Sequence, residues 1–299
     1  MTSFHRYLVE EVAVDHAEGL IPRREALHRL TLLGLALPAA SALLAACGTG
    51  QESAATVAAT PSIPVSPAGP SPLPTEAITF PGPEAGVTLQ GAWAAAREPR
   101  GAVLVIHENR GLNDHIRSVA GRLAASGYSS LAPDLLSREG GTAALGDPAQ
   151  ATAALGRVPQ DRFAADMKAA LSELERRAPG RKLGAVGFCF GGGMVWLLLS
   201  SREPRLSAAV PFYGPLPDNA DFSGAKAAVL AIYAGLDDRV NATRDQARAD
   251  LEKAGLTHEI VTFPGVNHAF FNDTGPRYDA GAAAQAYQRV LDWYGRYLG

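Results

Sequence analysis

Cysteine is scarce in this 299-residue chain, which contains only Cys47 and Cys189. Two cysteines cannot build the disulfide framework typical of small secreted proteins. Together with seven histidines they form no close ligand set, so we expect no metal and no cofactor. An excess of charge of one sign is also lacking, because the formal net charge is only −3. Without a basic field to attract phosphates, nucleic acid is not an expected partner.

A hydrophobic run long enough to span a bilayer is missing as well. Residues 30–44 are apolar, but Pro38 interrupts them and the stretch is short. Such a stretch is typical of the apolar core of a signal peptide, although it could also form a buried helix. Arg23 and Arg24 stand just before it and resemble a twin-arginine export signal. The match is imperfect, since Ala26 occupies a position where a bulky apolar residue is usual.

The apolar stretch ends in Leu44-Ala45-Ala46-Cys47, which resembles the bacterial lipobox. In a lipobox the cysteine is lipidated and becomes the mature N-terminus, whereas the alternative is a plain signal peptide with a chance cysteine. We therefore interpret residues 1–47 as a lipoprotein signal peptide with Cys47 as the lipidation site. The resulting enzyme or binding protein would be extracytoplasmic and anchored to a membrane, in the periplasm or on the outer cell surface.

Residues 48–75 are rich in Ala, Ser, Thr and Pro. A segment of this composition buries little apolar surface and tends to polyproline II, so we expect a disordered linker. The domain of interest then covers residues 76–299. It has no visible internal repeat, and we expect it to be monomeric.

From residue 76 onward, segments typical of strands and helices alternate. Alternation of this kind predicts an α/β fold with a mostly parallel sheet and helices on both faces, and the first two strands should form an antiparallel pair. The expected strands are 78–80, 89–94, 102–106, 128–131, 182–186, 206–213, 229–234 and 257–263, and the expected helices are 116–125, 162–177, 194–199, 243–254 and 280–297.

The most informative stretch is Gly187-Phe188-Cys189-Phe190-Gly191, between an expected strand and an expected helix. A nucleophile on a sharp strand-to-helix turn, with small residues on either side, is the nucleophile elbow of α/β-hydrolases. A Cβ at Gly187 or Gly191 should collide with the neighbouring strand or helix. The competing interpretation is a tight turn in which the cysteine only packs.

Two later loops supply the partners that such a nucleophile needs. Asp237 follows the expected strand 229–234, and His268 follows the strand 257–263. Taken alone, Asp237 could cap the next helix and His268 could be a surface residue. Nucleophile, acid and histidine in this order, each after its own strand, nevertheless predict a catalytic triad.

With Glu108 at the end of the strand 102–106, these residues resemble the dienelactone hydrolase family, whose elbow reads Gly-x-Cys-x-Gly-Gly. The resemblance covers the chain from about residue 76 to the C-terminus and implies an α/β-hydrolase fold of the carboxymethylenebutenolidase type. It also implies that Glu108 contacts the resting thiol and helps to generate the thiolate. The expected oxyanion hole consists of the backbone N–H groups of Phe190 and Asn109.

One position departs from the family pattern. Asn272 stands where the family has an arginine that holds the substrate carboxylate, and Arg277 could substitute for it. Dienelactone itself is therefore a doubtful substrate. The leading function is hydrolysis of small esters or lactones through a Cys-His-Asp triad and a covalent acyl-enzyme. The alternatives are a non-catalytic, lipid-tethered binding protein on the same fold, and a peptidase or acyltransferase that uses the same triad.

Overall fold

The computed structural model describes residues 2–47 and 67–299. Its centre is an eight-stranded sheet with the strand order β1-β2-β4-β3-β5-β6-β7-β8. The first two strands pair in antiparallel fashion with each other, β2 is antiparallel to β4, and every other pairing is parallel. The strands are β1 (Glu76–Pro81), β2 (Thr88–Ala94), β3 (Gly101–Ile106), β4 (Tyr128–Pro133), β5 (Leu183–Phe188), β6 (Leu206–Phe212), β7 (Ala228–Ala234) and β8 (His258–Phe263).

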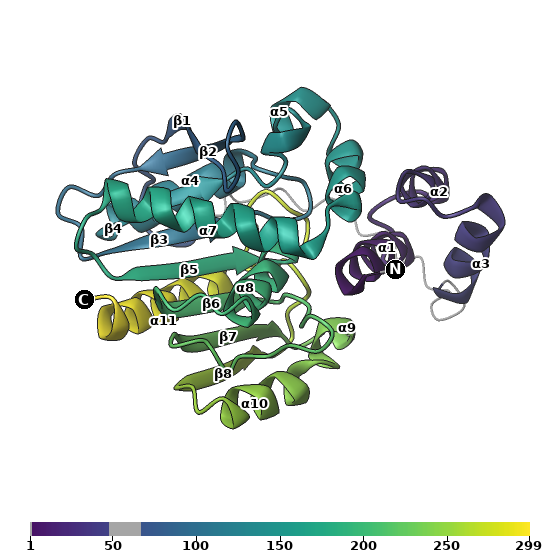
Figure 1. The fold of residues 1–299 in the computed structure, drawn as a ribbon. Coiled ribbons are helices and arrows are strands. Elements are labelled where there is room, and N and C mark those ends of the chain that lie inside the picture. The colour runs from purple at the N-terminus through teal and green to yellow at the C-terminus, as the bar shows by residue number, and fades with distance from the viewer. Residues whose placement is uncertain (1, 48–66) are drawn as a thin grey trace.

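The central strands are buried on both faces because helices cover the sheet from both sides. β3 reads Gly-Ala-Val-Leu-Val-Ile and all six of its residues are buried, which is the composition expected of a strand in a covered parallel sheet. Figure 1 shows α7 and α8 in front of the sheet, with α4 and α11 behind it. The main helices of the domain are α4 (Asp114–Ala125), α7 (Gln160–Arg177), α8 (Phe190–Ser200), α10 (Arg244–Lys253) and α11 (Ala280–Tyr297).

The structure confirms each strand and helix expected after residue 76, and it adds some that were not expected. The strand of the elbow continues to Phe188 and α8 begins directly at Phe190, so the turn consists of Cys189 alone. The additional elements are short or rich in alanine, which gives a weak pattern in the sequence. They are the 3₁₀ helix η2 (Ser137–Glu139), α5 (Thr142–Leu145), α6 (Pro148–Arg157) and α9 (Asp238–Asn241).

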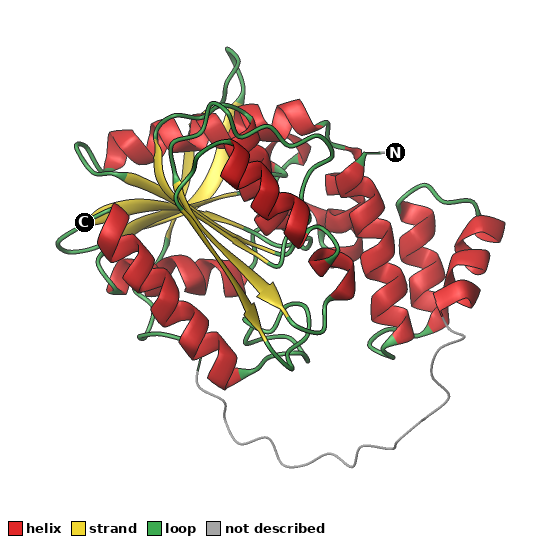
Figure 2. Ribbon diagram, turned by 90° about the horizontal axis from the view of Figure 1, so that it is seen from below, coloured by secondary structure: helices red, strands yellow, loops and turns green. Residues whose placement is uncertain are grey.

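Three helices precede the domain: α1 (Ser3–Ala17), α2 (Arg23–Leu32) and α3 (Leu37–Cys47). They lie side by side at one edge of the molecule, and α1 is the one that contacts α8 (Figures 1 and 2). Phe4, Tyr7 and Leu8 of α1 are buried in the same apolar core as the sheet. Within residues 2–47 and 67–299, no helix combines the length and the apolarity needed to cross a bilayer.

The expected linker lies only partly inside the described residues, since 48–66 fall outside them. Its last residues, 67–75, pack against α4 instead of standing clear of the domain. Ala68 is buried and its carbonyl accepts a hydrogen bond of 2.9 Å from Arg122. The Leu73 N–H donates to the carbonyl of Gly121 at 3.1 Å. The packed chain therefore begins before residue 76.

Candidate active site

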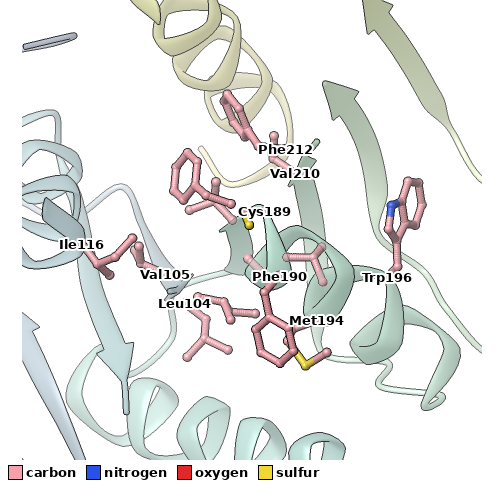
Figure 3. Close-up of a cluster of buried hydrophobic side chains, with 14 of the residues drawn as sticks. Leu104, Val105, Ile116, Cys189, Phe190, Met194, Trp196, Val210 and Phe212 are labelled. Carbon is pink, nitrogen blue, oxygen red and sulfur yellow. The ribbon is translucent and has the colours of Figure 1, made fainter. Parts of the chain in front are cut away.

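The turn that carries Cys189 is strained in the way a nucleophile elbow requires. Cys189 has φ 58° and ψ −121°, a conformation that side-chain-bearing residues rarely adopt, and its side chain is buried (Figure 3). A Cβ on Gly187 would collide with the backbone carbonyl of Gly191, and a Cβ on Gly191 would collide with the carbonyl of Ile106. The expected steric role of the two glycines is thus confirmed.

His268 and Asp237 meet at the carboxyl end of the sheet. The imidazole Nδ1 donates to Asp237 Oδ2 at 2.5 Å, and both side chains are buried. The other carboxylate oxygen, Oδ1, accepts the Val240 N–H at 3.3 Å and so caps α9. Asp237 therefore has both of the roles considered from the sequence. It caps a short helix with one oxygen and orients the histidine with the other.

The hydroxyl group of Tyr7 lies between the nucleophile and the histidine. It is 3.1 Å from Cys189 Sγ and 3.1 Å from His268 Nε2, although Tyr7 precedes Cys189 by 182 positions in the chain. Among the described residues, Sγ and Nε2 make no direct hydrogen bond to each other. Burial raises the pKa of Tyr7 well above its usual value, so the hydroxyl keeps its proton.

A second residue of α1, Glu11, makes this site electrostatically unusual. Glu11 Oε1 is 3.8 Å from His268 Nε2, and Oε2 accepts a short hydrogen bond from Arg239. Although burial opposes it, the carboxylates of Glu11 and Asp237 raise the pKa of His268 well above its usual value. The pKa of Glu11 is in turn lowered to about 2 by His268 and Arg239, again against the effect of burial. This arrangement therefore favours the imidazolium form of His268.

The same cluster contains three side chains that can bind a metal ion. Glu11, Cys189 and His268 each offer a ligand atom, and these atoms lie within 4.8 Å of one another. A cation already occupies the neighbourhood, however, because the Arg239 guanidinium pairs with Glu11. The raised pKa of His268 also favours a proton over a metal ion on Nε2.

Glu108 lies just beyond β3 and is held by the residue that departs from the family pattern. Its Oε2 accepts a hydrogen bond of 2.6 Å from Asn272 Nδ2. The other oxygen, Oε1, is buried and has no hydrogen-bond partner among the described residues. The resemblance implied a contact between Glu108 and the thiol, whereas in this structure the partner of the thiol is Tyr7. Asn272 therefore positions Glu108.

The two expected oxyanion donors lie at the start of α8 and in the loop after β3. Phe190 is the first residue of α8, so its N–H has no partner within the helix. Asn109 follows Glu108, and its carbonyl is held by the Thr152 hydroxyl at 2.9 Å. This hydrogen bond ties the loop after β3 to α6 (Pro148–Arg157).

A cavity of about 210 Å³ reaches Cys189 from the surface. The loop after β3 and the loop after β8 form one side of it, and α1 with the turn after it forms the other. Arg277 lies at this cavity, but its guanidinium pairs with Asp15 at 2.9 Å and Glu18 at 2.7 Å, both on or next to α1. The residues that line the cavity include Glu11, Asp15, Ile21, Glu108, Asn109, Cys189, His268, Asn272 and Arg277.

Sequence reasoning found Cys189, Asp237, His268 and Glu108, and the structure brings all four to one end of the sheet. It missed Tyr7, Glu11 and Arg239. The first two lie in a segment whose composition indicates a signal peptide, and nothing in the local sequence marks them as partners of a site far along the chain. Arg239 lies in the Asp-rich turn itself, but its partner on α1 is visible only in three dimensions.

Comparison with known proteins agrees with this geometry. The model of the Dienelactone hydrolase family matches residues 89–298. A protein of Escherichia coli O157:H7 named "Putative carboxymethylenebutenolidase" is 33% identical over 67% of this chain and 79% of its own length. A protein of Methylorubrum extorquens with the same name is 34% identical over 69% of this chain and 75% of its own.

Solved structures give the same result. The crystal structure of a "Putative Dienelactone Hydrolase" from Klebsiella pneumoniae superposes with a TM-score of 0.64 and 30% identity, covering 75% of this chain and 99% of that one. A dienelactone hydrolase-like phosphotriesterase from metagenomic libraries, 23% identical with a TM-score of 0.60, shares the fold over 76% of this chain and the whole of its own. The matched elbow, sheet order and relatives together place this chain in the dienelactone hydrolase family.

Proposed function

We propose that the protein hydrolyses small carboxylic esters or lactones through a covalent intermediate on Cys189. Membership of the dienelactone hydrolase family gives the reaction class as ester or lactone hydrolysis. The observation that supports the covalent route is a cysteine at a strained elbow, next to a histidine whose other nitrogen is hydrogen-bonded to Asp237 at 2.5 Å. Nucleophile, base and orienting acid in this relation are the parts of an acyl-transfer site.

The first half of the reaction forms a thioester. The Cys189 thiolate attacks the carbonyl carbon, and the N–H groups of Phe190 and Asn109 stabilise the resulting oxyanion. When the intermediate collapses, the carbon–oxygen bond to the alcohol breaks and His268 Nε2 gives its proton to the leaving oxygen. Asp237 stays beside Nδ1 and favours the protonated form of the imidazole. With a lactone, the leaving hydroxyl stays attached to the acyl group.

The second half releases the acid. His268, now neutral, takes a proton from a water molecule as that water attacks the thioester carbonyl. The carbon–sulfur bond then breaks, the carboxylic acid leaves, and the thiolate and imidazolium are restored. Asp237 holds Nδ1 throughout and so keeps Nε2 directed at the reacting atoms.

The cavity supports a small substrate. With α1 in place, a volume of about 210 Å³ admits a compact ester or lactone. The Asn272 side chain is neutral, so it offers a substrate carboxylate no positive charge. Its amide group is in addition already hydrogen-bonded to Glu108. Dienelactone is accordingly a weaker candidate than neutral esters and lactones.

The test is a panel of p-nitrophenyl esters and lactones with the wild type, Cys189→Ala and Cys189→Ser. The wild type should turn over the short-chain members, and Cys189→Ala should be inactive while keeping its far-UV circular dichroism spectrum. Cys189→Ser should retain little activity, because His268 would have to deprotonate an alcohol that is far less acidic than a thiol. A non-catalytic binding protein would hydrolyse no member of the panel.

We propose further that the chain is exported and lipidated at Cys47, and that it acts outside the cytoplasm. The support is the order of paired arginines, apolar stretch and Leu-Ala-Ala-Cys in residues 23–47. Cys47→Ser should abolish labelling by a clickable fatty acid in the native host and release the protein from the membrane fraction. If the wild type takes up no label, the proposed anchor does not exist.

A further inference from the structure

The helix α1 occupies the site in a way that hydrolysis does not require. Its Tyr7 hydroxyl contacts both reacting side chains, and its Glu11 pairs with Arg239 beside them. We propose that the catalytic site is a docking surface for this segment and that α1 is an intramolecular inhibitor, which slows turnover by the full chain until it is displaced or removed. This inference rests on the hydrolase function proposed above.

The position of Tyr7 carries the argument. The leaving oxygen of an ester must lie close to Sγ when the carbonyl carbon is attacked and within hydrogen-bond reach of Nε2 to receive its proton. The Tyr7 oxygen is 3.1 Å from each of these atoms and thus stands where the leaving oxygen must be. The Tyr7 oxygen is part of the chain and carries no acyl group, so no reaction can release it. Tyr7 therefore blocks the position of the leaving group.

The rest of α1 fixes Tyr7 in this place through charge. Tyr7, Glu11, Asp15 and Glu18 follow one another at helical spacing and share one face of the segment. Arg239 donates to the Tyr7 carbonyl at 3.0 Å, lies 4.4 Å from the centre of the Tyr7 ring, and pairs with Glu11.

Further along this face, Arg277 pairs with Asp15 and Glu18. Two cations of the catalytic domain thus bind an acidic stripe on α1. Apolar contacts add to the docking, since Phe4 lies edge-on to Phe190 with ring centres 6.0 Å apart.

The chain's relatives indicate that catalysis does not need α1. The match to the dienelactone hydrolase family begins at residue 89 and includes the regions of Glu108, Cys189, Asp237 and His268. The inhibitor is therefore attached to a catalytic unit that is complete without it. A cut before Cys47 at the proposed lipobox would remove α1, α2 and all of α3 except Cys47, so that export and activation would be the same event.

The experiment uses the full chain with Tyr7→Phe, Tyr7→Ala and the control Glu10→Gln. Glu10 is on the same helix but has no hydrogen-bond or ion-pair partner among the described residues. Two rates are measured: hydrolysis of p-nitrophenyl acetate, and alkylation of Cys189 by iodoacetamide, located by peptide mass spectrometry. Removing the hydroxyl should raise both rates by about tenfold, the effect of one or two hydrogen bonds on the docking equilibrium. Removing the ring should raise them further, and Glu10→Gln should match the wild type.

The outcomes separate the inhibitor from other roles of Tyr7. If Tyr7 relays protons between His268 and Cys189, Tyr7→Phe lowers hydrolysis, and the inhibitor proposal is wrong. Faster alkylation without hydrolysis in any variant supports docking over the thiol but refutes the proposed hydrolase function. Unchanged alkylation and hydrolysis in Tyr7→Ala overturn the inference.

A second variant covers the case in which Tyr7→Ala does not fold. Asp15→Asn/Glu18→Gln removes both partners of Arg277 at the more exposed end of the segment, away from the buried core. It should also raise the hydrolysis and alkylation rates, and the increase should shrink at high salt because the wild-type ion pairs are then screened. Rates equal to those of the wild type at low salt would contradict the proposal.

Discussion

Glu11→Gln is the substitution whose energetic effect can be worked out most directly. It replaces a buried carboxylate, which lies between His268 and Arg239, by a neutral group of the same shape. The pKa of Glu11 is about 2 in the folded protein, against an ordinary value of 4.5. Because the charged form is favoured by folding, the carboxylate stabilises the packed state of α1 at neutral pH.

The magnitude follows from the difference between these pKa values. One pH unit corresponds to about 1.4 kcal/mol, so the shift is worth on the order of 3 kcal/mol of unfolding free energy. Since the pKa is lowered on folding, the contribution is fully present above about pH 4.5 and is lost as the pH falls through about 2. At about pH 3, most of it, roughly 2 kcal/mol, is already gone.

The assay is urea unfolding of the wild type, Glu11→Gln and the control Glu10→Gln at about pH 6 and about pH 3. The wild type should be more stable than Glu11→Gln by on the order of 3 kcal/mol at the higher pH, and the difference should narrow to roughly 1 kcal/mol at the lower pH. Glu10→Gln should follow the wild type at both. A difference between wild type and Glu11→Gln that does not change with pH would refute the reasoning.

Three further substitutions test the site itself. Gly191→Ala should destabilise the fold by about 3 kcal/mol in urea unfolding, because its Cβ meets the carbonyl of Ile106, and near-wild-type stability would show that the elbow can relax. Asp237→Asn should lower kcat for ester hydrolysis by about 10³- to 10⁴-fold with little change in far-UV circular dichroism, since His268 loses the acceptor that fixes its tautomer. Asn272→Leu frees Glu108 and should change the pH dependence of Cys189 alkylation, whereas a profile superimposable on that of the wild type would mean that this hydrogen bond is not functional.

Much of the fold could be predicted because its signals are local. The buried strands read as short apolar runs, and the elbow glycines are required by contacts within a few residues of Cys189. The meeting of Asp237 and His268 also follows from the pattern, since the carboxyl ends of parallel strands lie at the same edge of the sheet.

What could not be predicted depends on contacts between distant segments. Asn272 was recognised only as a departure from a family pattern, and its hydrogen bond to Glu108 joins residues that are 164 positions apart. Tyr7 and Glu11 lie in a segment whose composition fits a signal peptide, so that its packing on the catalytic site leaves no trace in the local sequence. The α6 helix is rich in alanine and has few large apolar residues to mark its buried face.

The most direct test of the account is whether an acyl group becomes attached to Cys189 during turnover. The protein would be mixed with a slowly hydrolysed p-nitrophenyl ester, quenched in acid and digested for peptide mass spectrometry. We expect the peptide with Cys189 to gain the mass of the acyl group at early times and to lose it as substrate is exhausted, and Cys189→Ala should show neither adduct nor turnover. Hydrolysis by the Cys189→Ala variant at the wild-type rate would contradict the covalent mechanism.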